Sequence, residues 1–536
     1  MIESMDVKRI IKQKCDLLSL AITVGYMMMS LLFASSYIRH EYHKVVTEWY
    51  ASMCISRINV MVQIITYFMA FFCASFVVYF VIHAIRNLCG WEKKEIFQLV
   101  GWALPILICL IKAFVDYGNA VGFDTAYYNG DEYNIWLAAI VGYPFSFIYT
   151  SFVFLVSIFI FPFRYGPIIC KLFVTLFVAL YIVINTAKRT NRTFLVVWEY
   201  ILFLGGVYID QSVNTHRMFW YALLYVFICA EMFFLWYDTE CGESYSDDFI
   251  INKIVVTIAG FALLSVWRRE GIYLVIFAGV YWLIYIRKFS DLFISSKAVT
   301  RRMICIFITS LIVFWTPTII FESKVNNLDD GGIVYDASII WMIKEPTFDY
   351  SKSQDDLEQI NRVMSIEAIN RLVEAVGDDV YASCSYVYPS YEYCVMRDDY
   401  GPEDSQLFEK SVVNIIKKQP LVYLRSRVNA FMAVAKVRNE YNLIVPLILT
   451  VVLVFGGLIK KNLLVSLMSA GVLTHVVLTV LFMPANFFKY FYELYLYGYI
   501  FMILSLIEPH SKTRSTDELF LGKHKVALSK NMSLIK

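Results

Sequence analysis

Apolar runs of about twenty residues recur along the whole chain, and short polar turns separate them. A run of this length forms an α-helix long enough to cross a hydrocarbon core of about 30 Å. The pattern predicts about twelve such helices, at residues 17–37, 60–85, 98–115, 167–186, 193–210, 218–237, 252–266, 270–287, 303–321, 441–459, 463–483 and 490–508. We therefore expect an all-α polytopic membrane protein. Only 17% of the residues are charged, fewer than in soluble domains.

Lysine and arginine residues gather in alternate turns, which in short loops marks the cytoplasmic side of a membrane. The basic segments are the N-terminus, 86–94, 188–192, 287–302, 460–461 and the C-terminal tail. They share one side only if the segment 136–162 does not cross the membrane completely. Under that condition we expect a multi-pass protein of the plasma membrane with both termini in the cytoplasm.

The segment 136–162 contains a helix-breaking residue, Pro144, which removes a backbone donor. A re-entrant or interfacial segment would satisfy both the proline and the charge rule. The alternative is an ordinary kinked span, with one exception to the charge rule elsewhere.

The longest polar interruption, 322–440, is expected outside the cytoplasm. Its first part, Glu322 to Asp404, has eighteen acidic residues against six basic ones, and its apolar positions have helical spacing. From Lys410 to Arg438 the segment is basic and amphipathic, as expected of a helix on a membrane surface. We divide the chain into an N-terminal transmembrane hairpin (1–97), a transmembrane core (98–321), an extracytoplasmic acidic module with a juxtamembrane basic helix (322–440), C-terminal transmembrane helices (441–508) and a basic cytoplasmic tail (509–536).

Most of the eleven cysteines lie inside apolar runs, where cysteine is usually a small buried hydrophobe. Cys384 and Cys394 share a polar loop and would form a disulfide if that loop faces an oxidising compartment. The sequence has no Walker A, dinucleotide-binding or G-x-S-x-G motif, and nothing indicates nucleic-acid binding.

A polar stretch, Asp124 to Pro144, lies between two apolar runs, so its carboxylates are expected at a membrane surface. It contains Asp131-Glu132-Tyr133 and then Tyr143-Pro144-Phe145. Farther on, Trp267-Arg268-Arg269-Glu270-Gly271 forms a turn between two runs, and Phe488-Lys489-Tyr490 precedes the last run.

In this order the motifs resemble the GT-C superfamily, membrane glycosyltransferases that use polyprenyl-phosphate sugars, such as protein mannosyltransferases and lipid A aminoarabinose transferases. The resemblance covers 98–321 and 441–508, and implies a GT-C-like bundle with the first outer loop in the active site. The family's second proline after Tyr-Pro is absent here, and Lys489 stands where many members have arginine. Two additional spans, 17–37 and 60–85, precede the family's usual first helix.

Transfer of a sugar from a lipid phosphate needs a group that takes the proton of the attacking hydroxyl. The resemblance and the position favour Asp131 as this base, with Glu132 and Asp124 as alternatives. Either alternative could instead bind a divalent cation, Mg²⁺ or Mn²⁺, together with Asp131. Hydrated loop carboxylates without catalytic function are the competing interpretation.

The departing phosphate needs positive charge. The cationic candidates expected on the outer side are Arg268, Arg269, Arg217, His216 and Lys489. Pairing with Glu270 or with lipid headgroups is the alternative reason for their presence. The residues expected to line the substrate site are Tyr133, Tyr143, Pro144, Tyr490 and Glu493.

These expectations describe a membrane glycosyltransferase that moves a sugar from a polyprenyl-phosphate donor to a glycan, lipid or protein acceptor outside the cytoplasm. Two rivals remain: a polysaccharide polymerase, and a transporter or flippase for lipid-linked sugars.

Overall fold

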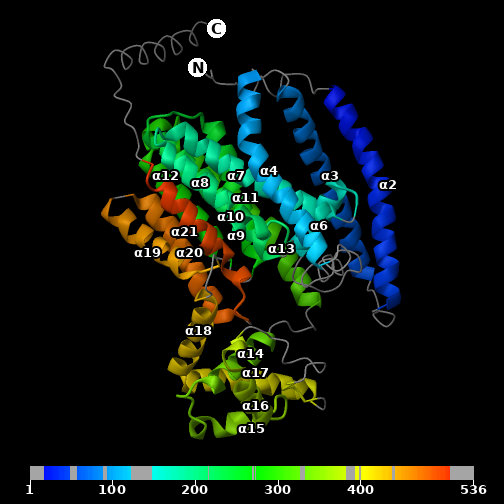
Figure 1. Cartoon of the computed structure of the whole chain (residues 1–536), viewed down its shortest axis with the longest axis vertical. Helices are drawn as coiled ribbons and strands as arrows, with labels where there is room; N and C mark the ends of the chain where they lie inside the picture. Colours follow the sequence, from blue (N-terminus) through cyan, green and yellow to red (C-terminus); the bar gives the residue numbers. More distant parts are fainter. Residues whose placement is uncertain are drawn as a thin grey trace.

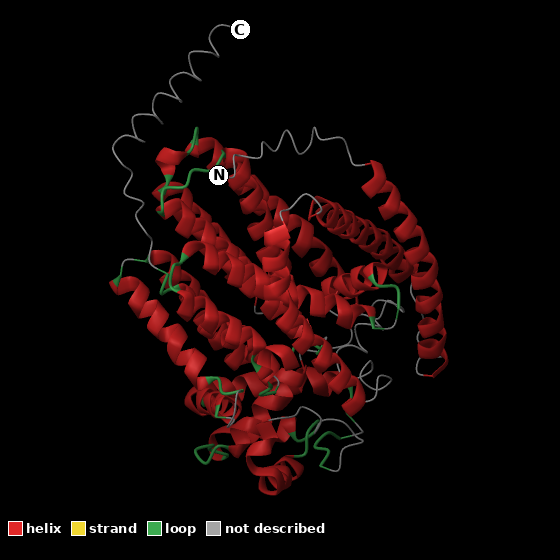
Figure 2. Cartoon of the chain, turned by 45° about the horizontal axis from the view of Figure 1, so that its top comes forward, coloured by secondary structure: helices red, strands yellow, loops and turns green. Residues whose placement is uncertain are grey.

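The computed structural model describes residues 17–48, 57–88, 93–121, 148–163, 165–214, 217–268, 271, 273–325, 332–381, 393–397, 400–436, 441–460, 462–483 and 485–507. These residues are mostly helical. The β-type pairing found among them is an isolated bridge between Met364 and Met396. Figure 1 shows a large helical bundle with a smaller helical module at one end, and Figure 2 shows the same parts from a tilted view.

The bundle consists of α2 (Leu17–Glu48), α3 (Arg57–Leu88), α4 (Lys93–Val121), α6 (Ile148–Ile160), α7 (Gly166–Arg189), α8 (Thr193–Leu204), α9 (Gly206–Asp210), α10 (Arg217–Glu240), α11 (Asp247–Trp267), α12 (Tyr273–Lys288), η2 (Ser290–Leu292), α13 (Ser296–Val325), α19 (Ile444–Ile459), α20 (Leu463–Phe482), η6 (Phe488–Phe491) and α21 (Tyr492–Leu504). The module consists of α14 (Gly332–Lys344), η3 (Ser351–Ser353), α15 (Gln354–Ile360), α16 (Ile366–Val376), η4 (Gly377–Tyr381), α17 (Pro402–Lys418) and α18 (Pro420–Ala435).

Six helices of the described part are long and apolar enough to cross a membrane: α4, α7, α10, α11, α13 and α20. Shorter apolar helices lie within α2, α3, α8 and α19. α12 and α21 are helical where spans were expected, but they have 16 and 13 residues. The structure thus supports a helical polytopic membrane protein, whereas the expected number of about twelve crossings is not confirmed.

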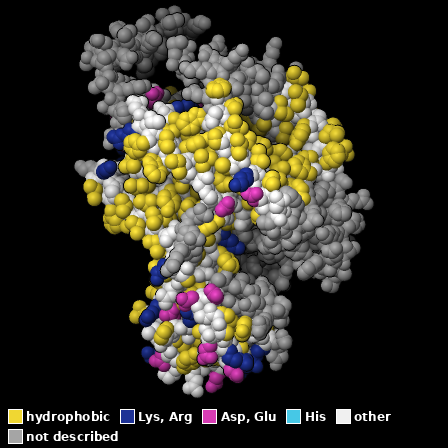
Figure 3. Space-filling model, in the orientation of Figure 1, with side chains coloured by type: hydrophobic (Ala, Val, Ile, Leu, Met, Phe, Trp, Pro, Cys, Tyr) yellow, Lys and Arg dark blue, Asp and Glu magenta, His cyan; other side chains and the backbone are white. Residues whose placement is uncertain are grey.

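The surface of the bundle agrees with a lipid environment. Large apolar side chains such as Phe72, Phe80 and Phe177 are more than half exposed on it, and Figure 3 shows apolar side chains over the bundle and charged ones on the module. A contiguous apolar surface of this extent is unusual for a soluble protein.

Helix α10 lies at the centre of the bundle, because 89% of its most apolar stretch is buried. It packs against α7, α11, α20 and α21. A helix that is apolar on every side can be stable only when other helices surround it. Its two ends therefore define the two ends of the bundle.

The C-terminal end of α10 binds basic residues from two other turns. Arg189 makes two hydrogen bonds of 2.7 and 2.6 Å to the carboxylate of Asp238, and Lys288 pairs with Glu240. Two of the basic segments that we expect on the cytoplasmic side, 188–192 and 287–302, therefore meet at one end of the bundle. The module lies at the opposite end (Figure 1).

The expected re-entrant segment is described only from residue 148. Helix α6 has 13 residues, or about 20 Å, and packs against α2, α3 and α7. Residues 136–147 lie outside the described part, so re-entry stays a prediction.

The basic stretch from Lys410 to Arg438 forms two helices, α17 and α18, which meet at Gln419 and Pro420. α17 packs on α15 inside the module, and α18 contacts α14 and α20. The Gln419 side chain fixes this junction, because its Nε2 donates to the Asp349 carbonyl at 2.9 Å and to Ser353 Oγ at 3.0 Å. α18 therefore joins the module to the bundle.

Close contact between α19 and α21 depends on Gly498. A Cβ at this position would lie 2.6 Å from the carbonyl oxygen of Pro446. We expect Gly498→Ala to lower the free energy of unfolding by about 1–3 kcal/mol, because the two helices must separate. Gly101→Ala in α4 is the matched control: no atom lies within 4 Å of its Cβ, and alanine in a helix is favoured over glycine by roughly 0.5–1 kcal/mol. Equal effects of the two variants in an unfolding experiment would contradict the close contact.

Candidate functional site

Three ionisable side chains meet in the interior of the bundle, near its module end. Arg268 follows the last residue of α11, His475 lies in α20, and Glu493 lies in the first turn of α21. Arg268 Nη1 is 3.6 Å from Glu493 Oε1, and His475 Nε2 is 2.6 Å from the same oxygen. Each of the three side chains is only 1% exposed. We call these three residues the Arg-His-Glu cluster.

The end of α11 places Arg268 in the cluster. The backbone becomes extended at Arg268 and turns back at Gly271, whose N–H donates to the Arg268 carbonyl at 2.9 Å. Only glycine fits this turn, since a Cβ at residue 271 would lie 2.9 Å from the carbonyl oxygen of Leu264. The Arg268 guanidinium donates to Thr479 Oγ1 at 3.3 Å and to the Tyr490 carbonyl at 3.4 Å.

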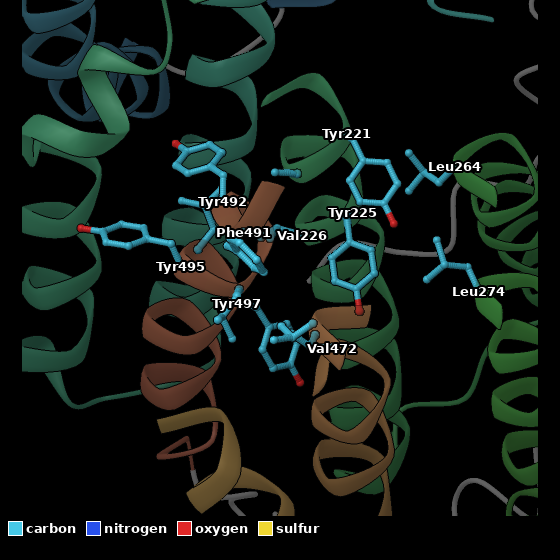
Figure 4. Close-up of a cluster of buried hydrophobic side chains, with 14 of the residues drawn as sticks. Tyr221, Tyr225, Val226, Leu264, Leu274, Val472, Phe491, Tyr492, Tyr495 and Tyr497 are labelled. Atoms are coloured by element: carbon cyan, nitrogen blue, oxygen red, sulfur yellow. The ribbon is translucent and has the colours of Figure 1, made fainter. Parts of the chain in front are cut away.

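Tyrosine rings surround the cluster. Tyr221 of α10 stacks on His475, with ring centroids 5.6 Å apart, and Tyr273 of α12 lies 5.7 Å from it. The Arg268 guanidinium lies 5.4 Å from the Tyr221 ring centroid. Figure 4 shows Tyr221 and Tyr225 on α10, with Leu264 and Leu274 on one side of them. Such rings shield the cluster from lipid and attract the cation through their faces.

Several polar atoms at this place have no hydrogen-bond partner within the described residues. They include His475 Nδ1, both carboxylate oxygens of Glu493 and the hydroxyl of Tyr273. A buried polar atom without a partner costs about 1–3 kcal/mol. Ionisable groups in a membrane interior are costly as well, and usually mark a functional site.

The segment between α20 and α21, residues 483–491, lies beside the cluster, and we call it the connector. It contains Lys489, whose Nζ lies 4.7 Å from the Phe487 ring centroid and 5.5 Å from that of Tyr490. Tyr490 contacts Arg268 through its carbonyl and also through its ring, 5.8 Å from the guanidinium. Lys489 and Arg268 are thus separated by a single aromatic residue.

The module holds this connector in place. Asn486 N–H donates to the Tyr381 carbonyl at 2.9 Å, and Asn486 Nδ2 donates to the Ala430 carbonyl at 3.2 Å. Arg427 Nη1 donates to the Met483 carbonyl at 2.6 Å. The position of the connector therefore depends on how the module docks.

A second buried cation, Lys171 in α7, lies at the same end of the bundle. Its Nζ donates to the carbonyl oxygens of Gln211 and Asn214 and lies 5.0 Å from the ring centroid of Phe219. Phe219 in turn packs edge-on against Tyr492, at the start of α21. Lys171 is thus connected to the first turn of α21 through the side chains of Phe219 and Tyr492.

Of the residues singled out in the sequence, the structure brings Arg268, Lys489, Tyr490 and Glu493 together. Arg217 begins α10, one turn before Tyr221, but its side chain is not described. The remaining candidates lie outside the described residues: Asp124, Asp131, Glu132, Tyr133, Tyr143, Pro144, His216, Arg269 and Cys384. Cys394 is half-buried, and a disulfide to Cys384 stays a prediction.

The polar stretch with the candidate base begins directly after α4, which ends at Val121. Phe114 in this helix packs edge-on against Tyr165, just before α7 begins. Because Lys171 is in the second turn of α7, the C-terminal end of α4 lies at the same end of the bundle as the cluster. Within the described residues no group of His, Cys, Asp and Glu could hold a metal ion. The expected cation site involves Asp124, Asp131 and Glu132, which are not among those residues.

His475 was not singled out in the sequence. The available signal was an ionisable side chain within the apolar run 463–483. Comparisons with known protein families, curated proteins and solved structures find no match to this chain.

Proposed function

We propose that this chain is an integral-membrane glycosyltransferase, which moves a sugar from a polyprenyl-phosphate donor to a glycan, lipid or protein acceptor outside the cytoplasm. The observation that carries the proposal is the buried Arg268, 3.6 Å from Glu493 and flanked by the connector with Lys489. Its place at the module end of a lipid-facing bundle suits a ligand with an isoprenoid tail in the membrane.

A lipid phosphate needs the charge that this site offers. When the bond between the sugar and the phosphate breaks, the bonding electrons remain on a phosphate oxygen. A guanidinium suits phosphate because its N–H groups match the phosphate oxygens in pairs. In a site without bulk water, fixed positive charge stabilises the developing negative charge more strongly than it would in water. We assign phosphate binding to Arg268, supported by Lys489.

The attacking hydroxyl must lose a proton, and Asp131 remains our candidate for the base, by resemblance to the GT-C superfamily. The end of α4 supports this choice, because the stretch that contains Asp131 begins at the same end of the bundle as Arg268. Glu132 and Asp124 are the alternatives. The module, which contacts the connector, would select or orient the acceptor.

Transfer from radiolabelled polyprenyl-phosphate sugars by purified protein in lipid discs tests the class of enzyme. We expect wild-type protein to transfer the label, and Asp131→Asn to lose about 10²–10⁴-fold in rate while it remains folded. Full activity of this variant would show that Asp131 is not the base, and would favour Glu132 or Asp124 in that role.

The same experiment separates the rivals. Linkage of successive repeat units into a chain would indicate a polysaccharide polymerase. If no donor supports transfer and labelled lipid still crosses the bilayer, the enzyme proposal is wrong and the chain is a flippase.

A further inference from the structure

We propose that Asn486 is a positioning residue for the donor site. It holds the connector where Tyr490 orients Arg268, and it thereby couples docking of the module to binding of the lipid phosphate. This inference rests on the proposed function and deepens it, because it names the contact through which the module acts on the site. Asn486 is only 9% exposed, and the sequence analysis did not select it.

The start of the connector is held by helix α18 of the module. Carbonyl groups at the end of a helix such as α20 lack partners within the helix. Tyr423 donates through its hydroxyl to the Leu481 carbonyl at 2.6 Å, and Arg427 Nη1 donates to the Met483 carbonyl at 2.6 Å. The two donors are four residues apart and so lie on one face of α18. The module therefore fixes the point at which the connector begins.

Asn486 continues this contact along the connector. Its N–H donates to the Tyr381 carbonyl at 2.9 Å, and its Nδ2 donates to the Ala430 carbonyl at 3.2 Å. Ala430 is three residues after Arg427, on the same face of α18, whereas Tyr381 is the last residue of η4. One residue thus ties the connector to two separate elements of the module.

The part of the module that binds Asn486 is firmly packed. The Tyr381 ring lies edge-on to Trp341 of α14, with centroids 5.5 Å apart, and its hydroxyl donates to Glu345 Oε1 at 3.4 Å. The same carboxylate oxygen accepts from Asn429 Nδ2 of α18 at 2.8 Å. Elements α14, η4 and α18 all contact one another. Asn486 is therefore bound to a single packed unit.

The other end of the connector contacts the donor site. After Asn486 the connector forms the short helix η6, which contains Tyr490. The Tyr490 carbonyl accepts from Arg268 Nη1 at 3.4 Å, and its ring centroid lies 5.8 Å from the guanidinium. Phe491 packs edge-on against Phe431 of α18, with centroids 5.1 Å apart. Contacts thus run from the module through Asn486 and η6 to the Arg268 guanidinium.

These contacts have a thermodynamic consequence. When docking of the module improves the affinity for a phosphate, binding of the phosphate stabilises the docked module by the same free energy. This coupling needs no direct contact between the ligand and the module. A lipid phosphate should therefore slow protease cleavage between module and bundle.

The test uses the full-length protein in lipid discs, with geranyl phosphate as the probe. Asn486→Ala removes the side-chain donor and keeps the backbone N–H that binds the Tyr381 carbonyl. We expect this variant to bind geranyl phosphate about tenfold more weakly than the wild-type protein. At saturation, the probe should slow cleavage between module and bundle about fivefold in the wild-type protein and less in the variant. Loss of this protection distinguishes a positioning residue from one that only stabilises the fold.

Asn414→Ala is the matched control. Asn414 Nδ2 donates to Asp356 Oδ1 at 3.2 Å, a bond within the module that has the same length as the bond from Asn486 Nδ2 to Ala430. This variant weakens the module without a change in the connector, so its affinity for geranyl phosphate should equal that of the wild-type protein. The protection of wild-type protein by the probe does not depend on the folding of any variant.

The outcomes separate this inference from the proposed function. If geranyl phosphate binds wild-type protein but does not slow cleavage, or binds Asn486→Ala with wild-type affinity, the inference about Asn486 is wrong and the donor site stands. Equal losses of affinity in Asn486→Ala and Asn414→Ala would also overturn it, because they would come from a weakened module. If geranyl phosphate does not bind to wild-type protein, the proposed donor site is wrong and the inference fails with it.

Discussion

Replacing Arg268 by glutamine is expected to lower the free energy of unfolding by about 3 kcal/mol, toward the lower end of the range for a broken buried ion pair. The variant would leave Glu493, which is 1% exposed, without its guanidinium. His475 remains 2.6 Å from the carboxylate and should limit the loss. Denaturation of the variant and the wild-type protein in the same detergent would measure the difference.

The double variant Arg268→Gln/Glu493→Gln is the decisive control. Because it removes both charges, it should recover most of the stability that the single variant loses. The double variant should still fail to bind a lipid phosphate, since the cation is absent. Additive losses in the two single variants and the double variant would show that Arg268 and Glu493 do not interact, and would contradict the cluster.

The second large effect is expected at Arg427, which joins the module to the bundle. Its side chain is fully buried, and its guanidinium donates to the Met483 carbonyl and to Ser338 Oγ. The guanidinium also lies 4.6 Å from the ring centroid of Trp341. We expect Arg427→Met to destabilise the docked module by about 2–4 kcal/mol, because a buried carbonyl and hydroxyl lose a charged donor.

Leu421→Met provides the control on the same helix. The Leu421 side chain is 78% exposed, and substitutions of exposed side chains usually change stability by about 0.5 kcal/mol or less. Protease cleavage between module and bundle should accelerate in Arg427→Met and stay near the wild-type rate in Leu421→Met. Equal cleavage rates in the two variants would contradict a docking role for Arg427.

Much of the fold could be predicted from the pattern of apolar and polar residues, because a membrane demands long apolar helices. The helical character of the module followed from residues such as Leu357, Ile360, Ile369 and Leu372, which are buried in α15 and α16. The number of crossings could not be derived in the same way. Because apolar residues continue through turns and connectors, the pattern predicts one span at 490–508, whereas α21 has 13 residues.

The sequence pattern selects some of the residues that meet in the described part of the candidate site, but not their arrangement. Arg268 and Glu493 stood out because ionisable residues are costly near a membrane interior. Their contact could not be foreseen, since they are far apart in the sequence and lie on helices whose packing partners the pattern does not reveal. His475 has the same signal, but a single histidine in an apolar run also fits an ordinary core position. Its importance comes from the carboxylate beside it, which only the structure shows.

Charge pattern was least informative about the basic stretch from Lys410 to Arg438. It predicted a helix on the membrane surface, where basic residues face lipid headgroups. Arg427 is instead completely buried, because carbonyl and hydroxyl acceptors and two aromatic rings surround its guanidinium. A sequence pattern does not distinguish a basic residue in solvent from one that is buried with such partners.

The most direct test of the proposed donor site is photo-crosslinking of wild-type protein with a polyprenyl-phosphate sugar that has a diazirine in its first isoprene unit. The labelled peptides, found by mass spectrometry, should contain residues 262–275 and 470–495, around Arg268, His475 and Glu493. Excess unlabelled polyprenyl phosphate should prevent the crosslink. Labelling confined to the opposite end of the bundle, around Arg189 and Lys288, would contradict the donor site and the glycosyltransferase that we infer from it.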